Sequence, residues 1–314
     1  MVGGWIWSYA RTPAPGNKES IVLIPQGAGV RQIKTILINQ GTITDDVRFL
    51  VLTRITDTAG RLRAGEYLIP PGQTPLQVLH LLEQGEVIPH PVTIPEGMTT
   101  RQVAEILKKG KWIDLHHFLA LTRNPEFIRS LGLQLDNLEG YLFPDTYVLT
   151  RGNVSEEQLI SMMTKRFLSV WRNLEKPPES NMSRHQVMTL ASIVEKETAA
   201  PRERPVISRV FLNRLEKKMR LQSDPTVIYG LPDFNGNLTR EDLKTKTPYN
   251  TYVITGLPPG PICNPGKDSI AAVLQPADVP YLYFVSKNDS THHFSANLRE
   301  HNRAVRKYQK NRTP

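Results

Sequence analysis

The sequence has only one cysteine, Cys263, among its 314 residues. A single cysteine excludes both an intramolecular disulfide framework and a multi-cysteine zinc site. We therefore interpret Cys263 as a loop residue without a chemical role. His292 and His293 are adjacent and would diverge on a strand, and no cluster of carboxylates or thiols accompanies them, so we expect no metal site there.

The chain also lacks an apolar run of the roughly 20 residues that a helix needs to cross a bilayer. Its first ten residues, MVGGWIWSYA, are too short and too interrupted. Their aromatic residues, followed by Arg11, are nevertheless typical of the aromatic edge of a membrane segment. Residues 12–19 contain two prolines and a glycine, which indicates a linker. We interpret residues 1–19 as a juxtamembrane remnant followed by that linker.

Acidic residues are fewer than basic residues. The chain has 30 aspartates and glutamates and 39 lysines and arginines, which give a net charge of +9. Such a surface attracts polyanions, among which nucleic acid, anionic lipid and the acidic cell-wall polymer all qualify. The basic residues are dispersed and no nucleic-acid motif accompanies them, so we expect no nucleic-acid partner. An ordinary solvated surface is the alternative interpretation.

A short motif recurs three times in the first third of the chain. It begins at Ile24, again at Ile94 and, in a more degenerate form, at Ile69. Each copy predicts a short strand, a turn containing proline and glycine, and a helix with apolar residues at positions i, i+3 and i+4. Because such short units bury their faces only against one another, we expect the three copies to pack together.

The segment VMTLASIVEKET, residues 187–198, brings a carboxylate onto an apolar helical face. At about 100° per residue, Glu197 falls between the columns of Leu190 and Ile193, whereas Glu195 lies at the edge of the apolar arc. Apolar surroundings raise the pKa of a carboxyl group, which suits a general acid near neutral pH. Glu197 is therefore the candidate catalytic residue. The alternative is a solvated glutamate in the last turn of an amphipathic helix.

Three loop segments follow this helix, at residues 220–226, 247–252 and 256–266, and each is rich in proline, glycine, asparagine or aspartate. Amide side chains offer both donors and acceptors, and tyrosine offers a flat face with a polar tip. Together they suit a sugar ring with hydroxyl and N-acetyl groups, although each segment alone would be read as a turn. The candidate substrate-binding residues are Glu195, Gln222, Asp224, Tyr249, Asn250 and Tyr252.

Six motifs between residues 191 and 285 resemble the endolytic murein transglycosylases, also called the YceG-like or MltG family, and the resemblance covers nearly all of the chain. The motifs are ASIVEKET, FLNRL, MRLQSDPTVIYG, YNTY, GLPPGPI and YLYFV. The resemblance implies that Glu197 is the catalytic residue. A more distant similarity to lysozyme-like lytic transglycosylases, through Leu221 with Gln222 and Tyr249 with Asn250, implies that these residues line the substrate cleft.

The resemblance also implies an α+β fold, with LysM-like N-terminal strand/helix repeats followed by a mixed α/β lytic transglycosylase catalytic domain. After residues 1–19 we expect a LysM-like region at 20–91, a third repeat and connecting segment at 92–150, and the catalytic domain at 151–314. Glu139 and Asp145 lie in the connecting segment and are second-choice acidic residues, interpreted mainly as structural. Within the catalytic domain we expect helices at about 155–173, 183–198 and 201–218, a strand at 281–285 and a terminal helix at 294–308.

The expected activity is endolytic cleavage of the β-1,4 bond from N-acetylmuramic acid to N-acetylglucosamine. It leaves a 1,6-anhydro end, uses one glutamate as general acid and base, and needs no metal or other cofactor. One alternative is a lysozyme-type hydrolase in which Glu195 or Asp224 activates water. Another is a non-catalytic scaffold that binds peptidoglycan.

Family resemblance implies a single N-terminal transmembrane helix in the bacterial cytoplasmic (inner) membrane, with the catalytic part outside the cytoplasm. This sequence departs from the pattern because that helix is missing from it. The expected partners are peptidoglycan glycan strands and the cytoplasmic membrane, and proteins of cell-wall synthesis are further candidates.

Overall fold

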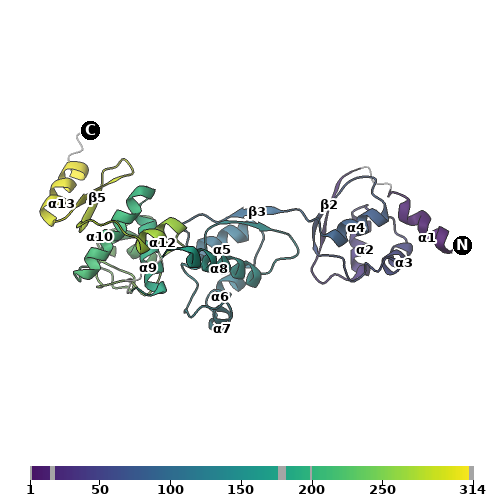
Figure 1. Ribbon diagram of the computed structural model, residues 1–314, viewed down its shortest axis with the longest axis horizontal. Helices are drawn as coiled ribbons and strands as arrows, with labels where there is room; N and C mark the ends of the chain where they lie inside the picture. The colour runs from purple at the N-terminus through teal and green to yellow at the C-terminus, as the bar shows by residue number, and fades with distance from the viewer. Residues whose placement is uncertain (1, 15–17, 176–181, 199, 311–314) are drawn as a thin grey trace. The chain divides into compact units, whose positions relative to one another are not determined.

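The structure is a computed structural model that describes residues 2–14, 18–175, 182–198 and 200–310. The chain divides into two compact units, which are described one at a time (Figure 1). The first unit comprises Met1–Val92 and Thr146–Ser155, and the second comprises Thr93–Asp145 and Glu156–Pro314. The described residues form helices and three two-stranded sheets, β1-β2, β3-β4 and β5-β6, so the fold class is α+β.

The first unit is built from four helices and four short strands. In chain order its elements are α1 (Val2–Arg11), β1 (Ser20–Ile24), α2 (Val30–Asn39), α3 (Arg48–Ile55), β2 (Gly65–Ile69), α4 (Pro75–Gln84), β3 (His90–Thr93), whose last residue begins the second unit, and β4 (Thr146–Leu149). Strands β1 and β2 are antiparallel, with Ser20 opposite Ile69 and Ile24 opposite Gly65.

The three sequence repeats are confirmed as strand, turn and helix units. They are β1 with α2, β2 with α4, and β3 with α5 (Thr100–Lys109). Each turn contains a glycine with positive φ at the same position of the repeat, Gly27 at 78°, Gly72 at 73° and Gly97 at 74°. That left-handed conformation favours glycine, which explains the recurring residue.

The third copy does not join the sheet of the first two. The first two join through the β1-β2 sheet. The third copy is split between the units, since β3 pairs with β4 and α5 packs against α6 (Leu115–Leu121). A partner strand from residues 146–149 and a helix from the following segment thus replace the repeat neighbours that we expected.

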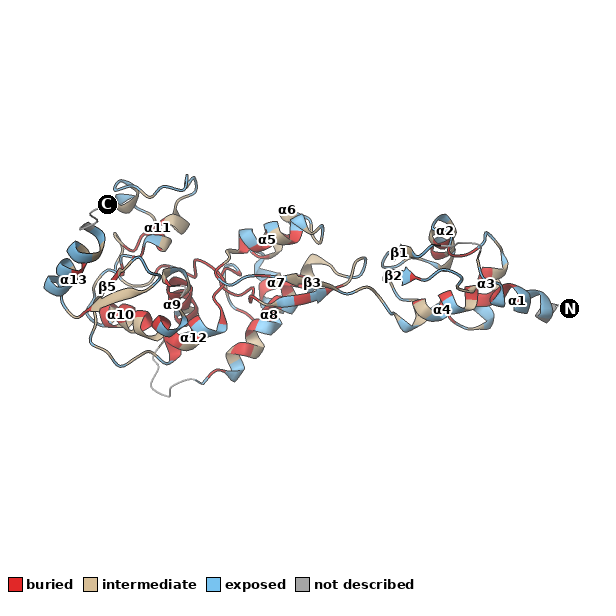
Figure 2. Cartoon of the chain, turned by 90° about the horizontal axis from the view of Figure 1, so that it is seen from above, coloured by how far each residue is buried: buried red, intermediate tan, exposed pale blue. Residues whose placement is uncertain are grey.

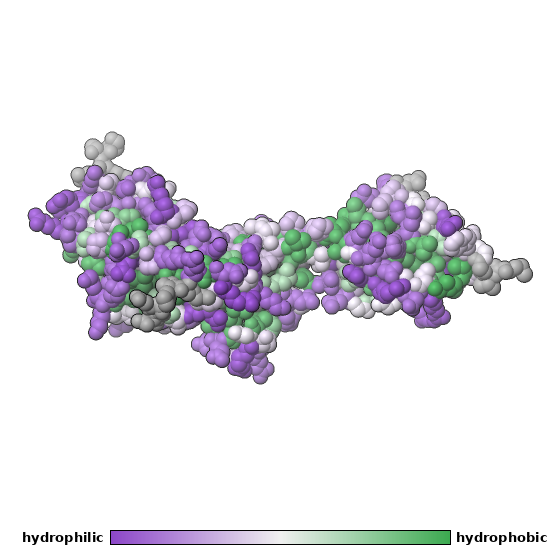
Figure 3. Space-filling view, viewed as in Figure 1, coloured by the Kyte–Doolittle hydropathy of each residue, from purple (hydrophilic) through white to green (hydrophobic). Residues whose placement is uncertain are grey.

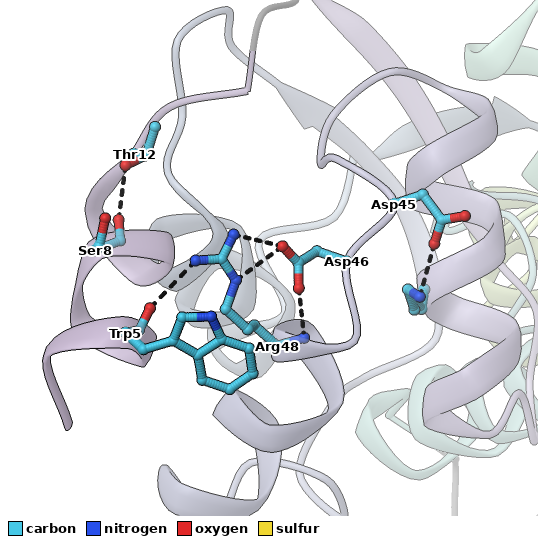
Figure 4. A network of polar contacts seen from close by, with 7 residues as sticks. Trp5, Ser8, Thr12, Asp45, Asp46 and Arg48 are labelled. Atoms are coloured by element: carbon cyan, nitrogen blue, oxygen red, sulfur yellow. Dashed lines mark hydrogen bonds and ion pairs between the residues drawn. The ribbon is translucent and has the colours of Figure 1, made fainter. Parts of the chain in front are cut away.

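Helix α1 packs into the first unit through Ile6, Tyr9 and Ala10, which are buried in its core. Arg48 donates a hydrogen bond to the carbonyl oxygen of Trp5 at 3.2 Å and forms an ion pair with Asp46 (Figure 4). Burial raises the pKa of Tyr9 to about 12. Among the described residues, none of the helices is both long and apolar enough to span a bilayer. The membrane role of this segment stays a prediction.

The second unit contains most of the helices. Beyond α5 and α6 its elements are α7 (Pro125–Ser130), α8 (Glu156–Asn173), α9 (Arg184–Glu197), η1 (Pro201–Glu203), α10 (Arg204–Glu216), α11 (Asp224–Gly230), η2 (Asp242–Lys244), α12 (Lys267–Leu274), β5 (Tyr283–Ser286), β6 (His292–Ser295), α13 (Leu298–Val305) and the π-helical turn η3 (Arg306–Lys310). Hydrophilic side chains dominate the visible face of this unit in Figure 3.

Helix α9 is the central element of the second unit. It begins at a capping box, in which Ser183 and Gln186 satisfy each other's backbone N–H groups. Every residue from Val187 to Val194 is buried, because α10, α11 and α12 all contact this helix (Figure 2). The sequence predicted a single apolar arc on this helix. The buried surface is wider than that arc, since the helix is buried on all sides from Val187 to Val194.

The predicted helices at 155–173, 183–198 and 201–218 are confirmed as α8, α9, and η1 with α10. The predicted strand at 281–285 is confirmed as β5, with its bounds shifted to Tyr283–Ser286. The predicted helix at 294–308 is wrong at its start, because Phe294 belongs to β6. Helix α13 begins only after Asn297, whose side chain accepts a hydrogen bond from the N–H of Glu300 at 3.0 Å.

Candidate active site

Glu197 is the last residue of α9, where the helix leaves the buried core. Its Oε1 accepts a hydrogen bond from Ser223 Oγ at 2.5 Å. Burial raises the pKa of the Glu197 carboxyl to about 7, against the lowering effect of the Ser223 hydrogen bond, and the negative charge of Asp224 raises it further. A carboxyl group with this pKa holds a proton near neutral pH and can also release it.

Ser223 is held in place by a cluster of buried hydroxyl groups. Its N–H donates to Thr251 Oγ1 at 2.9 Å, and its carbonyl oxygen accepts from Thr226 Oγ1 at 2.7 Å. The hydroxyls of Thr226 and Thr251 lie 2.8 Å apart. Sequence reasoning missed Ser223, although it stands between two of the candidate residues. A preorganised donor therefore faces the Glu197 carboxyl before any ligand binds.

Glu197 opens into a cavity of about 390 Å³ in the second unit. Three of the predicted site residues, Gln222, Asp224 and Tyr252, line the same cavity. Gln222 is exposed and has a φ of 51°, and Tyr252 donates a hydrogen bond from its hydroxyl to Asp224 Oδ1 at 2.6 Å. The remaining wall residues are Arg214, Leu221, Phe284, Val285, Ser286, His292, His301, Val305 and Gln309.

Arg214 links the two sides of this cavity from a buried position. Its Nε donates to the carbonyl oxygen of Leu282 at 2.7 Å, and its Nη1 donates to the carbonyl oxygen of Leu221 at 2.7 Å. Burial lowers the pKa of Arg214, and its positive charge lowers that of Glu197. The sequence analysis did not select Arg214, even though it lies in the FLNRL motif.

Glu195 does not line this cavity, contrary to its placement as a substrate contact or a water-activating carboxylate. Two residues before Glu197 on α9, it faces about 200° away. It accepts a hydrogen bond from the N–H of Gly266 at 2.9 Å and pairs with Arg204 at 3.4 Å. Arg204 also lies 3.6 Å from both Glu96 and Asp268. Glu195 and Arg204 thus form the buried part of an ion-pair network whose other members, Glu96 and Asp268, are exposed.

Asn250 is fully buried, and its side chain is occupied inside the protein. Its Nδ2 lies within hydrogen-bond distance of the carbonyl oxygens of Asp242, Leu243 and Thr245, and its Oδ1 accepts from the N–H of Tyr252. This geometry favours a role in holding the loop that carries Tyr252. Direct contact with a substrate stays a prediction that these hydrogen bonds do not support.

Tyr249 lies on a different cavity from Glu197. It packs edge to face against Tyr229, with ring centroids 4.7 Å apart, and borders a second cavity of about 690 Å³. The structure therefore brings Glu197, Gln222, Asp224 and Tyr252 together and separates Tyr249 from them.

Glu139 and Asp145, the second-choice acidic residues, lie outside the cavity of Glu197. Glu139 is buried and accepts hydrogen bonds from the N–H of Thr100 at 2.9 Å and the hydroxyl of Tyr229 at 3.2 Å. Burial raises its pKa to about 7. Asp145 forms an ion pair with Arg166 at 2.6 Å. Their contacts are those of structural residues, as the sequence analysis mainly held.

The remaining histidine and cysteine candidates make internal contacts. His292 pairs with Glu203 at 2.7 Å. Cys263 is fully buried, which raises the pKa of its thiol, and its Sγ donates to the carbonyl oxygen of Ser192 at 3.3 Å. Within the described parts of the chain, no three histidine, cysteine, aspartate or glutamate side chains are grouped so as to hold a metal ion.

Comparison with known proteins relates this arrangement to one family. The model of the YceG-like family matches residues 22–307. An endolytic murein transglycosylase from Bacillus subtilis (strain 168) is 42% identical over 172 residues, which are 54% of this chain and 48% of the relative. Another, from Streptococcus pneumoniae serotype 2 (strain D39 / NCTC 7466), is 27% identical over 327 aligned residues, covering 93% of this chain and 59% of the relative.

A crystal structure of a putative YceG-like protein from Listeria monocytogenes is similar in fold. Its TM-score is 0.63 at 34% sequence identity, and the match covers 92% of this chain and 99% of that one. The present chain spans 48% to 59% of the length of the two transglycosylases. A family match over residues 22–307 includes both units and every candidate site residue. The chain belongs to the YceG-like family.

Proposed function

We propose that the protein is an endolytic lytic transglycosylase that cleaves the β-1,4 bond from N-acetylmuramic acid to N-acetylglucosamine and leaves a 1,6-anhydro end. The observation that carries the proposal is the Glu197 carboxyl, which opens into a cavity and has a pKa raised to about 7 by burial. A group of this kind can donate a proton in one step and accept one in the next.

Glu197 would protonate the glycosidic oxygen as its bond to the anomeric carbon breaks. The 6-hydroxyl of the muramic acid would then attack that carbon and pass its proton to the Glu197 carboxylate. Because the nucleophile belongs to the substrate, no second carboxylate is needed to activate water, unlike in most glycosidases. Closure within one molecule also gains the advantage of an intramolecular reaction. The mechanism uses neither a metal nor another cofactor.

Ser223, Gln222 and Tyr252 have distinct roles in this proposal. Ser223 orients the Glu197 carboxyl through the 2.5 Å hydrogen bond. Gln222 presents an exposed amide to the cavity and would hydrogen-bond the substrate. Tyr252, fixed by Asp224, offers an aromatic face beside it.

The names of the two bacterial relatives support murein as the substrate, since both are called endolytic murein transglycosylases. We further propose that the first unit is LysM-like and positions the enzyme on glycan strands. Its antiparallel β1-β2 sheet packed with short helices supports this assignment. An N-terminal helix outside this sequence would anchor the protein in the bacterial cytoplasmic membrane, with the second unit on the extracytoplasmic side near proteins of cell-wall synthesis.

Digestion of purified peptidoglycan followed by mass spectrometry tests the proposal. A lytic transglycosylase yields anhydromuramoyl products, which are lighter than hydrolysis products by the mass of one water molecule. Products with reducing ends would instead identify a hydrolase, with Asp224 as the remaining carboxylate in the cavity. Binding of glycan strands without any cleavage would identify a scaffold.

A further inference from the structure

The second unit contains a cavity larger than the one at Glu197, with no lining residue in common. Its volume is about 690 Å³, against about 390 Å³ for the cavity at Glu197. The side chains on its wall that could recognise a ligand are those of Arg129, Gln134, Asp136, Asn137, His185 and Tyr249. A cavity of this size accommodates a small organic group.

His185 is locked in place on this wall. The carbonyl oxygen of Pro259 can only accept, so His185 Nε2 carries the hydrogen of their 2.8 Å bond. His185 Nδ1 lies 3.0 Å from the hydroxyl of Tyr141, so both ring nitrogens are engaged in internal hydrogen bonds.

The charge of the wall favours a neutral ligand. Arg129 and Asp136 carry opposite charges, and both ring nitrogens of His185 are occupied by internal hydrogen bonds. Peptidoglycan offers two kinds of group, acidic stem peptides and uncharged N-acetylated sugars. A stem peptide with several carboxylates would need an excess of cations, which this wall does not provide.

The uncharged side chains of the wall fit the second kind of group. Gln134 presents an amide that can pair with an acetamido group and with hydroxyls, and Asn137 adds its Nδ2 donors, since its Oδ1 accepts from the N–H of Glu139 at 2.9 Å. Tyr249 contributes an aromatic ring that is held against Tyr229. A sugar ring carries the apolar face that stacks on such a ring and the polar rim that pairs with such amides.

Two elements connect this cavity to the active site. Helix α9 carries His185 near its first residue and Glu197 at its last, about 18 Å apart at 1.5 Å per residue. The loop at 247–252 places Tyr249 on one cavity and Tyr252 on the other. Between the two tyrosines, Asn250 is fully buried and anchors the loop. Both cavities are thus fixed to one rigid frame.

We propose that this cavity is a second saccharide subsite, which binds an N-acetylated amino sugar of the same glycan strand whose scissile bond lies at Glu197. The proposal rests on the function proposed above, because it takes its ligand from the same polymer. A strand held at two separated points would be gripped within its length, which favours internal cleavage over attack at an end.

Histidine-selective NMR of the full chain tests the subsite, because His185 reports on the second cavity while His292 and His301 report on the cavity of Glu197. The measurement uses the Glu197→Gln variant, so that the oligosaccharides are not cleaved while the spectra are recorded. The probes are β-1,4-linked N-acetylglucosamine oligomers, a dimer and an octamer, and the acidic tetrapeptide L-alanyl-D-isoglutamyl-L-lysyl-D-alanine. We expect the octamer to shift the resonances of all three histidines and the tetrapeptide to leave His185 unchanged.

Variants on the wall sharpen the test. Arg129→Ala and Gln134→Ala should each raise the octamer concentration that half-saturates the His185 shift, by about three- to tenfold for one lost hydrogen bond. Arg101→Ala, an exposed arginine on α5 away from both cavities, is the matched control and should change nothing.

The subsite is disproved if His185 stays unshifted by every oligomer, or if the tetrapeptide shifts it and the oligomers do not. Failure of the proposed function is a separate result, because it is judged by whether the wild-type chain cleaves peptidoglycan. If the octamer shifts the His185 resonance but the wild-type chain cleaves no peptidoglycan, the subsite proposal stands and the proposed enzymatic function is wrong.

Discussion

Ser223 donates a hydrogen bond to Glu197 across 26 positions of sequence, with Oγ 2.5 Å from Oε1. The bond joins the last residue of α9 to the residue that precedes α11, and Ser223 is itself fixed by Thr226 and Thr251. A hydrogen bond to the ionised carboxylate lowers a pKa, whereas burial raises it. The balance of these two effects sets the pKa of Glu197 at about 7.

Ser223→Ala should therefore move the pH dependence of the reaction. Without the hydrogen bond the pKa of Glu197 rises, so the carboxyl stays protonated to higher pH. We expect the falling alkaline limb of kcat/KM to move up by about one to two pH units, since a hydrogen bond to a charged group is worth about 1.5–3 kcal/mol. Activity at the optimum should fall because the carboxyl loses its orientation.

The pH profile of kcat/KM on soluble glycan strands measures this shift. Ser130→Ala is the matched control, because Ser130 is exposed at the end of α7 and its hydroxyl donates to the carbonyl oxygen of Phe127 within the same helix. If the alkaline limb of Ser223→Ala stays at the wild-type pH, that limb does not report the ionisation of Glu197.

Gln222→Ala should lower activity and spare stability, whereas Asn250→Ala should lower stability. Gln222 is exposed in the cavity, so its loss should reduce cleavage about 5- to 150-fold, the equivalent of one substrate hydrogen bond at about 1–3 kcal/mol, with little change in Tm. Asn250 is buried and bonded to backbone carbonyl oxygens, so its loss should lower the free energy of unfolding by about 1–3 kcal/mol. Calorimetry and single-turnover cleavage together distinguish the two.

Glu195→Gln should destabilise the protein without altering the chemical step. It removes one negative charge from the network around Arg204, which is itself buried. Leaving that arginine less well paired should cost about 1–2 kcal/mol, less than a full deletion because glutamine can still accept the Gly266 hydrogen bond. We expect a lower Tm with an unchanged kcat. A reduced kcat in the folded variant would show that Glu195 takes part in the reaction.

Glu139 should make the stability of the second unit depend on pH. Its pKa is about 7 in the folded protein against an ordinary value of 4.5, so the folded state binds more protons than the unfolded state between those values. Stability is then complete below about pH 4.5 and falls as pH rises towards 7, by up to about 1.4 kcal/mol per unit. Glu197 adds a slope of the same sign.

Glu139→Gln removes the contribution of Glu139 while keeping an acceptor for the Thr100 N–H. The variant should match the wild-type protein near pH 4 and exceed its stability at pH 8 by about 1–3 kcal/mol. Urea unfolding at both values checks the difference. Equal pH dependence in the two proteins would show that Glu139 has an ordinary pKa.

Local sequence signals predicted the elements well. The proline and glycine turns marked all three repeats, and their glycines adopt the left-handed conformation that the turns require. Helices α8, α9 and α10 follow the apolar periodicity of the sequence. Phe294 was misplaced in a helix because its strand is stabilised by pairing with Phe284 of β5, a contact that no local pattern carries.

Long-range packing decided the parts that the sequence could not predict. The sequence placed Glu195 at the edge of the apolar arc as a substrate contact, but it could not show that Arg204 and Gly266 would occupy its carboxylate. Ser223 and Arg214 enter the site only because segments distant in sequence meet there. Asn250 resembled a substrate contact, yet the backbone of residues 242–245 occupies its amide.

Cleavage of peptidoglycan by Glu197→Gln tests the central claim most directly, because the substitution keeps the shape of the side chain and removes the transferable proton. Glu216→Gln, an exposed glutamate on α10, is the matched control. We predict that Glu197→Gln folds with a normal Tm and loses about 10²–10⁴-fold in the rate of anhydromuramoyl product formation, while the control keeps full activity. A folded Glu197→Gln protein that retains more than about a tenth of the wild-type rate would contradict Glu197 as the general acid and base.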